Sequence, residues 1–344
     1  MVAAISRRFC ISALGVTGAA HLVGCTGRAA LPPVTHAPRP PARSIDPIDV
    51  DTPAERATDG PLARAGDEAT VKRERTAPLL DLPARPPQAE SGSEFLVRCE
   101  GLERSAMDDA VVAAIEAGNI PQHLRKLVPI HMVDEETGRT AVLFVTCDYL
   151  AIGPDADFVR MPMTSAAAQR LCNRLGTVLP TPRLVDAIYA QATVKLPPSW
   201  IDGGPTEGTL ADYGAHNQKL EARRRGNDLP LGSLVAGHKK DIVLCERMFD
   251  RPGKVAIYGW HERAGKVVQP LSTRHSCRYA DYSHGIRLVD QLMTIDGAVH
   301  RVADVLTDPD LAPILSEDGA LTVTEYSTVL PEYTGGPTRK PRRK

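Results

Sequence analysis

The order of apolar and polar residues changes twice along the chain. An apolar stretch near the amino terminus ends at Cys25, residues 26–93 then show no regular pattern, and apolar periodicity begins at about Glu94. From there, apolar residues at helical spacing predict helices over 105–117, 164–176, 181–192 and 209–226. Ser105 and Thr181 are candidate N-caps, Pro182 suits a first helical position, and Gly118 and Gly176 mark ends.

Alternating or short continuous apolar runs predict strands in the remaining segments. In the first half these are 94–103 and a hairpin over 127–153 that turns near Glu136-Thr137-Gly138. In the second half the strand-like runs cover 231–245, 254–262, 265–271, 285–295 and 298–306, with a short helix over 308–319. Asp296-Gly297 is a two-residue hairpin signal. We therefore predict one α+β domain over 94–330, with helices mainly in its first half and largely antiparallel strands in its second.

Residues 26–93 contain 12 prolines and no Phe, Tyr or Trp. Such a composition buries too little apolar surface to offset the entropy of ordering, which predicts a disordered tether over 25–93, counted from the lipid-bearing cysteine. The last residues, 331–344, are basic and are predicted to be a disordered tail. The formal net charge of −1 is near balance, so the chain carries no overall footprint of nucleic-acid binding.

The amino terminus has the layout of a bacterial export signal over residues 1–24. Ser6-Arg7-Arg8-Phe9 resembles the twin-arginine signal, with one residue fewer before the phenylalanine. Leu22-Val23-Gly24-Cys25 resembles the lipobox of bacterial lipoproteins, which implies that Cys25 is acylated and becomes the first residue of the mature protein. Multiple acyl chains hold a protein on a bilayer. The predicted location is the cell envelope, at the outer membrane if the host has two, since Thr26 rather than Asp follows the cysteine.

Four of the nine histidines after Cys25 fall within the 47 residues from His238 to His284. Each of them except His275 lies at or near the end of an apolar β run, so neighbouring strands would bring these imidazoles to one rim, where binding and catalytic groups are often placed. We consider three readings. The first is a zinc site formed by His238 with Asp241, His261, and His284 or Asp281. The second is a Cys277 thiolate activated by His275. In the third, the histidines bind a polar ligand such as a glycan, or pack.

Within the candidate site, His284 beside Asp281 would be a base held in one tautomer. Three further candidates are Arg287, Tyr258 and Trp260, of which Arg287 would meet an anionic group of the substrate. Tyr258 and Trp260 would stack on sugar rings or brace the sheet, and strand alternation places both on the face opposite Ile257 and His261. Ile286 and Leu288 should be buried, with Gly285 at the junction between a polar loop and their strand. The mature chain also holds Cys99, Cys147, Cys172, Cys245 and Cys277, an odd number that leaves at least one thiol unpaired.

Ser283-His284-Gly285 followed by Ile286-Arg287-Leu288 resembles the Ser-His-Gly-Cys-Ile-Arg-Leu signature of bacterial L,D-transpeptidases, and residues 256–261 are loosely similar to that family's Ile-His-Gly strand. The nucleophilic cysteine of the signature is absent here, so the resemblance implies a cell-envelope setting rather than transpeptidase activity. Residues 237–243 and 279–289 also resemble segments of exported bacterial proteins, which implies no particular activity. Together these features predict an anchored envelope protein that acts as a hydrolase on peptidoglycan or another extracellular polymer. The alternative is a non-catalytic lipoprotein that binds a glycan or a partner protein.

Overall fold

The computed structural model describes residues 76–201 and 209–330, which belong to one compact unit, Glu68–Lys344. The fold of these residues is α+β, with helices mostly in the first half and strands later, as predicted. The α-helices are α1 (Gly92–Arg98), α2 (Arg104–Glu116), α3 (Ser165–Leu175), α4 (Pro182–Gln191), α5 (Leu210–Arg225) and α6 (Val302–Thr307). Short 3-10 turns occur at η1 (Gln122–Leu124), η2 (Glu246–Met248) and η3 (Ala312–Ile314).

The larger sheet is organised around β2 (Thr140–Thr146), which pairs antiparallel with β1, β12 and β13. Its other strands are β1 (Leu127–Val133), β5 (Thr177–Val178), β12 (Val289–Asp290), β13 (Leu292–Ile295) and β14 (Ala298–Arg301). Both hairpins of this sheet turn where the sequence predicts. Gly138 takes a φ of 72° between β1 and β2, and Asp296 and Gly297 take φ values of 50° and 89° between β13 and β14.

A second sheet of four strands, in the order β10-β9-β8-β11, carries five of the predicted site residues: Asp241, Tyr258, Trp260, His261 and His284. Its strands are β8 (Lys240–Ile242), β9 (Ile257–His261), β10 (Val267–Ser272) and β11 (His284–Gly285). The strands β8, β9 and β10 are antiparallel neighbours, whereas β11 runs parallel to β8. Two short pairs complete the described strands: β3 (Ala151–Ile152) with β4 (Val159–Arg160), and β6 (Val194–Lys195) with β7 (Val235–Ala236).

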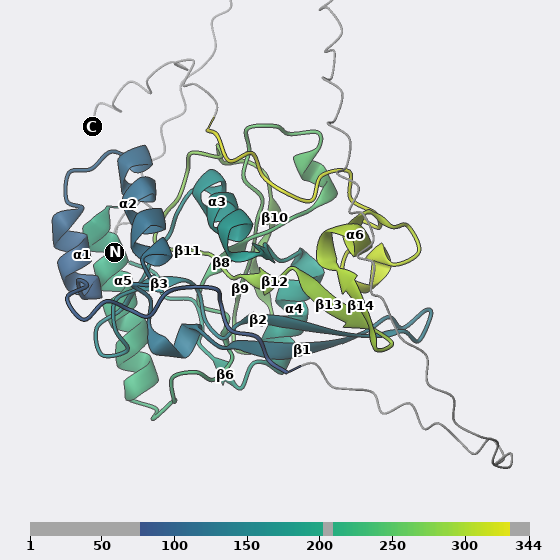
Figure 1. The fold of residues 1–344 in the computed structure, drawn as a ribbon, viewed down its shortest axis with the longest axis horizontal. Coiled ribbons are helices and arrows are strands. Elements are labelled where there is room, and N and C mark those ends of the chain that lie inside the picture. The colour runs from purple at the N-terminus through teal and green to yellow at the C-terminus, as the bar shows by residue number, and fades with distance from the viewer. Residues whose placement is uncertain (1–75, 202–208, 331–344) are drawn as a thin grey trace, which may run out of the picture. The chain divides into compact units, whose positions relative to one another are not determined.

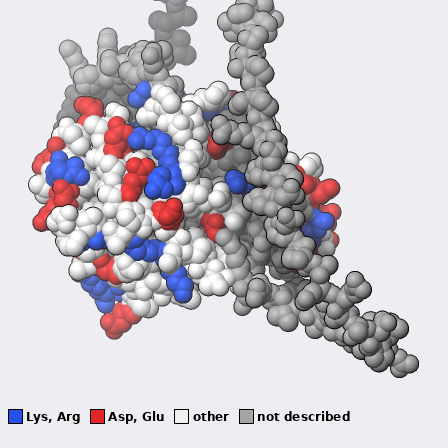
Figure 2. Space-filling model, viewed as in Figure 1, with Lys and Arg blue, Asp and Glu red and all other residues white. Residues whose placement is uncertain are grey.

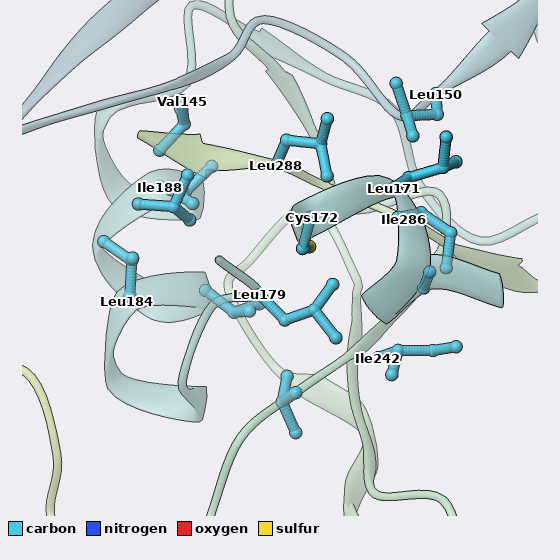
Figure 3. Packing of buried hydrophobic residues seen from close by; sticks show 14 of the residues in the cluster. Val145, Leu150, Leu171, Cys172, Leu179, Leu184, Ile188, Ile242, Ile286 and Leu288 are labelled. Carbon is cyan, nitrogen blue, oxygen red and sulfur yellow. The ribbon is translucent and has the colours of Figure 1, made fainter. Parts of the chain in front are cut away.

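The core lies where α3 and α4 meet the strands (Figure 3). In this view Ile188 of α4 lies beside Val145 and Leu171 of α3 lies beside Leu150, and these side chains, with Cys172 and Leu288, are all buried. Ile286 is also fully buried, so the run after Gly285 lies inside the domain as predicted. The helices α1, α2 and α5 lie together on one side of the described region, and α6 with the β13–β14 hairpin lies on the other (Figure 1). This leaves the four-stranded sheet between them.

The predicted strand over 94–103 is wrong. Residues Gly92–Arg98 form α1, because Ser91 and Glu94 make a capping box: the Ser91 hydroxyl accepts a hydrogen bond from the Glu94 amide, and the Glu94 carboxylate accepts one from the Ser91 amide. This local signal outweighs the apolar run Phe-Leu-Val that suggested a strand. The predicted cap at Ser105 is also wrong, since α2 begins after Glu103, whose side chain makes no capping bond.

Two predictions near the carboxyl end are only partly right. Residues 298–306 divide into β14 and the helix α6, and the predicted helix over 308–319 is reduced to the single turn η3. At the other end, residues 76–93, which the proline content assigned to the tether, pack on the domain. Leu80 is buried in the core and Leu79 bridges to Lys126, so the packed region begins before Glu94. The signal peptide, Cys25 and the tail over 331–344 lie outside the described residues.

Candidate functional site

The histidines that the sequence singled out do not meet at one rim. They occupy three neighbourhoods: His284 on β11 with the His275 ring 6.5 Å away, His261 against α4, and His238 in the interior. Each neighbourhood supplies its own carboxylate partner. Their exposure decides which of them a ligand can reach.

The first neighbourhood is built by β11 and the loop before it. The His284 Nε2 atom lies 4.0 Å from Asp281 Oδ2, and both side chains are buried. Hydroxyls of Ser283 and Tyr279 donate to Asp281 over 2.5 and 2.8 Å. Neither ring nitrogen of His284 has a hydrogen-bond partner in the described structure. A buried imidazole in that condition is uncommon and marks the position for water, a ligand or a proton-transfer role.

Charge in this neighbourhood is set by burial and by Lys240, which pairs with His284 in the sheet register. Burial, opposed by Asp281 and aided by Lys240, lowers the pKa of His284 to about 4, so the imidazole is neutral near pH 7. Burial alone would raise the pKa of Asp281, but His284, Lys240 and the two hydroxyl donors hold it below its ordinary value. Burial also lowers the pKa of the Lys240 ammonium. The result is an ionised carboxylate beside a neutral imidazole.

The second neighbourhood joins β9 to α4 through Asp186, a residue that sequence reasoning missed. His261 Nε2 lies 2.8 Å from Asp186 Oδ1, and the Tyr258 hydroxyl donates to Asp186 Oδ2 over 2.8 Å. Tyr258 and His261 therefore reach the same carboxylate, which contradicts the predicted alternation. The reason is local: Gly259 and Trp260 have φ values of 106° and 59°, so the strand twists out of regular alternation.

The third neighbourhood is an interior ionic network. His238 Nε2 lies 3.2 Å from Asp148 Oδ1 without hydrogen-bond geometry, and the Arg160 guanidinium donates to Asp148 Oδ2 over 2.6 Å and to Glu221 Oε1 over 3.0 Å. Burial lowers the pKa of His238 to about 4, although Asp148 opposes this. Since all of these side chains are less than 9 % exposed, the network braces the fold and is closed to a large ligand.

Arg287, which we expected to meet an anionic substrate, belongs to the interior. It is 1 % exposed and donates to the carbonyl oxygens of Thr146 and Val235, both over 2.7 Å. Its guanidinium lies over the Tyr149 ring and 3.8 Å from Asp241, whose carboxylate accepts the Tyr149 hydroxyl hydrogen bond over 2.7 Å. Arg287 therefore ties strands together and is not available to a substrate.

The predicted zinc ligands have separate partners. His238 faces Asp148, His261 faces Asp186, and Asp241 is bonded to Tyr149. Among residues 76–201 and 209–330, no three His, Cys, Asp or Glu side chains lie close enough to hold one metal ion. The zinc site stays a prediction that the described geometry does not support.

The hypothesis of a Cys277 thiolate activated by His275 has no geometric support either. Cys277 is 7 % exposed, and its thiol is unpaired like those of the other four described cysteines, all of them buried. The His275 ring stacks on Tyr279 at 4.1 Å, and no hydrogen bond joins it to Cys277 in the part of the chain that the structure describes.

One surface in this region is open to a large ligand. Trp200 is 56 % exposed, and its ring lies 4.9 Å from that of Trp260, which is 5 % exposed. The Lys240 ammonium lies 4.8 Å from the centre of the Trp260 ring. We call Trp200, Trp260 and Lys240 the tryptophan–lysine surface. Sequence reasoning identified Trp260 but missed Trp200, although it is the other of the two tryptophans in the chain.

No helix among the described residues has both the length and the apolar character needed to cross a bilayer. No family model, curated protein or solved structure matches the chain. Inference about its function therefore rests on the residues themselves.

Proposed function

We propose that this protein is a lipid-anchored lipoprotein of the bacterial envelope whose folded domain binds a glycan-containing polymer at the tryptophan–lysine surface. The observation that carries the proposal is the exposed indole of Trp200 beside the braced indole of Trp260. An exposed aromatic ring is apolar surface in contact with water, so covering it with another apolar surface is favourable. The C–H face of a sugar ring supplies such a surface.

The arrangement around Trp200 favours binding over simple packing. Trp260 is held in place by the hydrogen bond from its Nε1 to the His238 carbonyl oxygen, and the Trp200 carbonyl accepts a hydrogen bond from Lys219 of α5. The Trp260 indole and the backbone that carries Trp200 are thus held before a ligand arrives, which reduces the entropy lost on binding. Lys240 adds a cation at the edge, suited to a sugar with an acidic substituent.

Co-sedimentation of the full chain with purified peptidoglycan sacculi and with insoluble polysaccharides tests this proposal. Trp200→Ala should weaken binding by about five- to 150-fold, if loss of this stacking contact costs about 1–3 kcal/mol, as it does for bases stacked on aromatic side chains, and Trp200→Phe should retain part of it. Val133→Ala, a similarly exposed apolar residue in the other sheet at 55 % exposure, is the control. Equal binding by Trp200→Ala and the parent chain would rule out this surface.

A hydrolase is the second candidate, favoured by the unpartnered His284 imidazole next to the ionised Asp281. A neutral imidazole with an unoccupied ring nitrogen can accept a proton from water or a hydroxyl. Release of soluble fragments from sacculi by the parent chain, and its loss in His284→Gln with an unchanged melting temperature, would support this candidate. Binding without release of fragments would leave the non-catalytic role.

Export and acylation concern residues outside the described structure and rest on the lipobox resemblance. Cys25→Ser should move the protein from the membrane fraction to the soluble fraction, because the acyl chains would be lost. Unchanged membrane association would exclude the anchor while leaving the binding surface untouched.

A further inference from the structure

A groove of about 770 Å³ lies beside β10, the edge strand of the four-stranded sheet. Arginines supply its charge: Arg247 and Arg251 come from the segment after β8, and Arg274 follows β10. Asp250 is the one acidic residue of its lining. The lining also includes residues with hydrogen-bonding side chains: Gln269, Ser272, Thr273 and His275.

Two of these arginines, Arg251 and Arg274, make no side-chain interaction within the described structure that would account for their presence in the groove. The Arg247 guanidinium donates to the Leu271 carbonyl oxygen over 3.2 Å, which fixes it at the wall of the groove. In the described part of the chain, neither Arg251 nor Arg274 has an ion-pair or hydrogen-bond partner for its side chain, and both are exposed. By contrast, basic and acidic side chains are interspersed on the face drawn in Figure 2. Guanidinium groups present donors in a planar fork that matches carboxylate and phosphate oxygens.

The backbone at the groove is unsuited to pairing with another strand. The register between β10 and β9 shifts between Gln269 and Ser272, and Pro270 lies inside that irregularity. A proline and a bulge on an edge strand prevent the addition of a further strand. The groove is therefore lined for recognition by side chains.

His275, which lines the groove, also belongs to the neighbourhood of His284, with 6.5 Å between the two ring centres. His275 lines the groove and stacks on Tyr279, which donates to Asp281, and Asp281 adjoins His284. His284 is paired with Lys240 in the sheet, and Lys240 lies over Trp260. Asp281, His284 and Trp260 are at most 5 % exposed, so these contacts connect the groove to the tryptophan–lysine surface through the interior of the domain.

We propose that this groove, which we call the arginine groove, binds the acidic groups of an anionic polysaccharide. The inference rests on the proposed function and deepens it: the polymer whose sugar rings meet Trp200 carries carboxylate or phosphate groups that Arg247, Arg251 and Arg274 bind. Lys240 of the tryptophan–lysine surface contributes a fourth cation.

Binding of the full chain to soluble polymers tests the groove separately from the indoles. The probes are polygalacturonate as a carboxylate polymer, long-chain polyphosphate as a phosphate polymer, dextran as a neutral glycan and single-stranded DNA as an unrelated polyanion. Arg251→Ala/Arg274→Ala should weaken binding to at least one of the first two at least tenfold. It should also make the dependence of log affinity on log salt shallower by about one to two, since each cation contact contributes about 0.7–0.9 to that slope in nucleic-acid binding. The matched control is Arg225→Ala/Arg263→Ala, which removes two exposed arginines outside the groove lining and changes the net charge equally.

The outcomes separate the two proposals. The preference between polygalacturonate and polyphosphate identifies the acidic group. Equal loss in both double variants, no binding to either acidic polymer, or tighter binding to DNA than to both would overturn the groove proposal. If Trp200→Ala lowers binding to sacculi while Arg251→Ala/Arg274→Ala changes nothing, the proposed function stands and the groove fails. If the arginine variant alone matters, the groove stands and the tryptophan–lysine surface fails.

Discussion

At the scale of single residues, Gly285 explains why the stretch before the buried run has its composition. A Cβ added to Gly285 would lie 2.5 Å from Cδ1 of the Tyr149 ring. That ring cannot move away easily, because its hydroxyl is bonded to Asp241 and its face is covered by Arg287. The glycine is therefore required by close packing, and the histidine and arginine around it are held in the interior by the same contact.

Gly285→Ala should lower the free energy of unfolding by about 1–3 kcal/mol, the usual cost of overpacking a rigid core. Gly214→Ala is the matched control: its nearest neighbour is the flexible Leu96 side chain at 3.1 Å, and it lies inside α5, where alanine is favoured over glycine by about 1 kcal/mol. Urea unfolding of both variants measures the difference. A Gly285→Ala protein as stable as the parent would show that the Tyr149 ring is free to shift.

The residue scale also shows where sequence reasoning about the site ends. The polar residues around His284 were identified because they cluster in sequence. Asp186 and Trp200 were missed because each reaches the site from a separate part of the chain, and a single sequence carries no signal for contacts at such separations. Arg287 was misread for a physical reason. A buried arginine with backbone carbonyl partners looks the same in sequence as one that faces a ligand.

At the scale of elements, helix ends were predicted well where a cap and a stop coincide. Gly176 ends α3 and Thr181 with Pro182 begins α4, as the residues indicated, and Thr164 caps the start of α3. The error at α1 arose because its seven residues are too few to show helical periodicity, so the apolar run was given more weight than the cap. Short strands such as β11 were placed less well, since their pairing depends on distant partners.

The capping box of α1 makes a prediction at this scale. Ser91→Ala should cost about 0.5–2 kcal/mol of stability, because the Glu94 amide loses its acceptor. Ser105→Ala should cost much less, since Ser105 lies within α2 and does not cap it. Thermal and urea unfolding of the two variants distinguish the roles. Equal losses would mean that the Ser91 side chain does not hold the start of α1.

At the scale of the whole molecule, the buried imidazoles predict a loss of stability in acid. Burial lowers the pKa of both His238 and His284 to about 4, against about 6.5 in an unfolded chain. The unfolded state therefore binds more protons between pH 6.5 and 4, so stability falls as the pH falls through that window. His216, whose pKa burial also lowers, adds to the loss. Asp241 opposes it, because burial raises its pKa to about 6 and the folded state gains a proton below that pH.

The histidines whose pKa is lowered by burial outnumber the carboxylates whose pKa is raised, so acidification lowers the free energy of unfolding. We expect the free energy of unfolding to fall by on the order of 2–4 kcal/mol between pH 7.5 and 4.5, measured from urea midpoints. His284→Gln should reduce the size of this fall, because it removes one of the titrating groups. A midpoint that is constant across the window would show that these imidazoles are hydrated in solution.

The central claim is that one ligand spans the tryptophan–lysine surface and the arginine groove. Hydrogen exchange of the full chain with and without a bound acidic polysaccharide tests it most directly. Protection is expected in peptides that cover 196–201, 257–261 and 269–279 together, with no change along α1 and α5. Protection confined to α1 and α5, or absent at both the indoles and the arginines in a sample that has bound the polymer, would contradict the account.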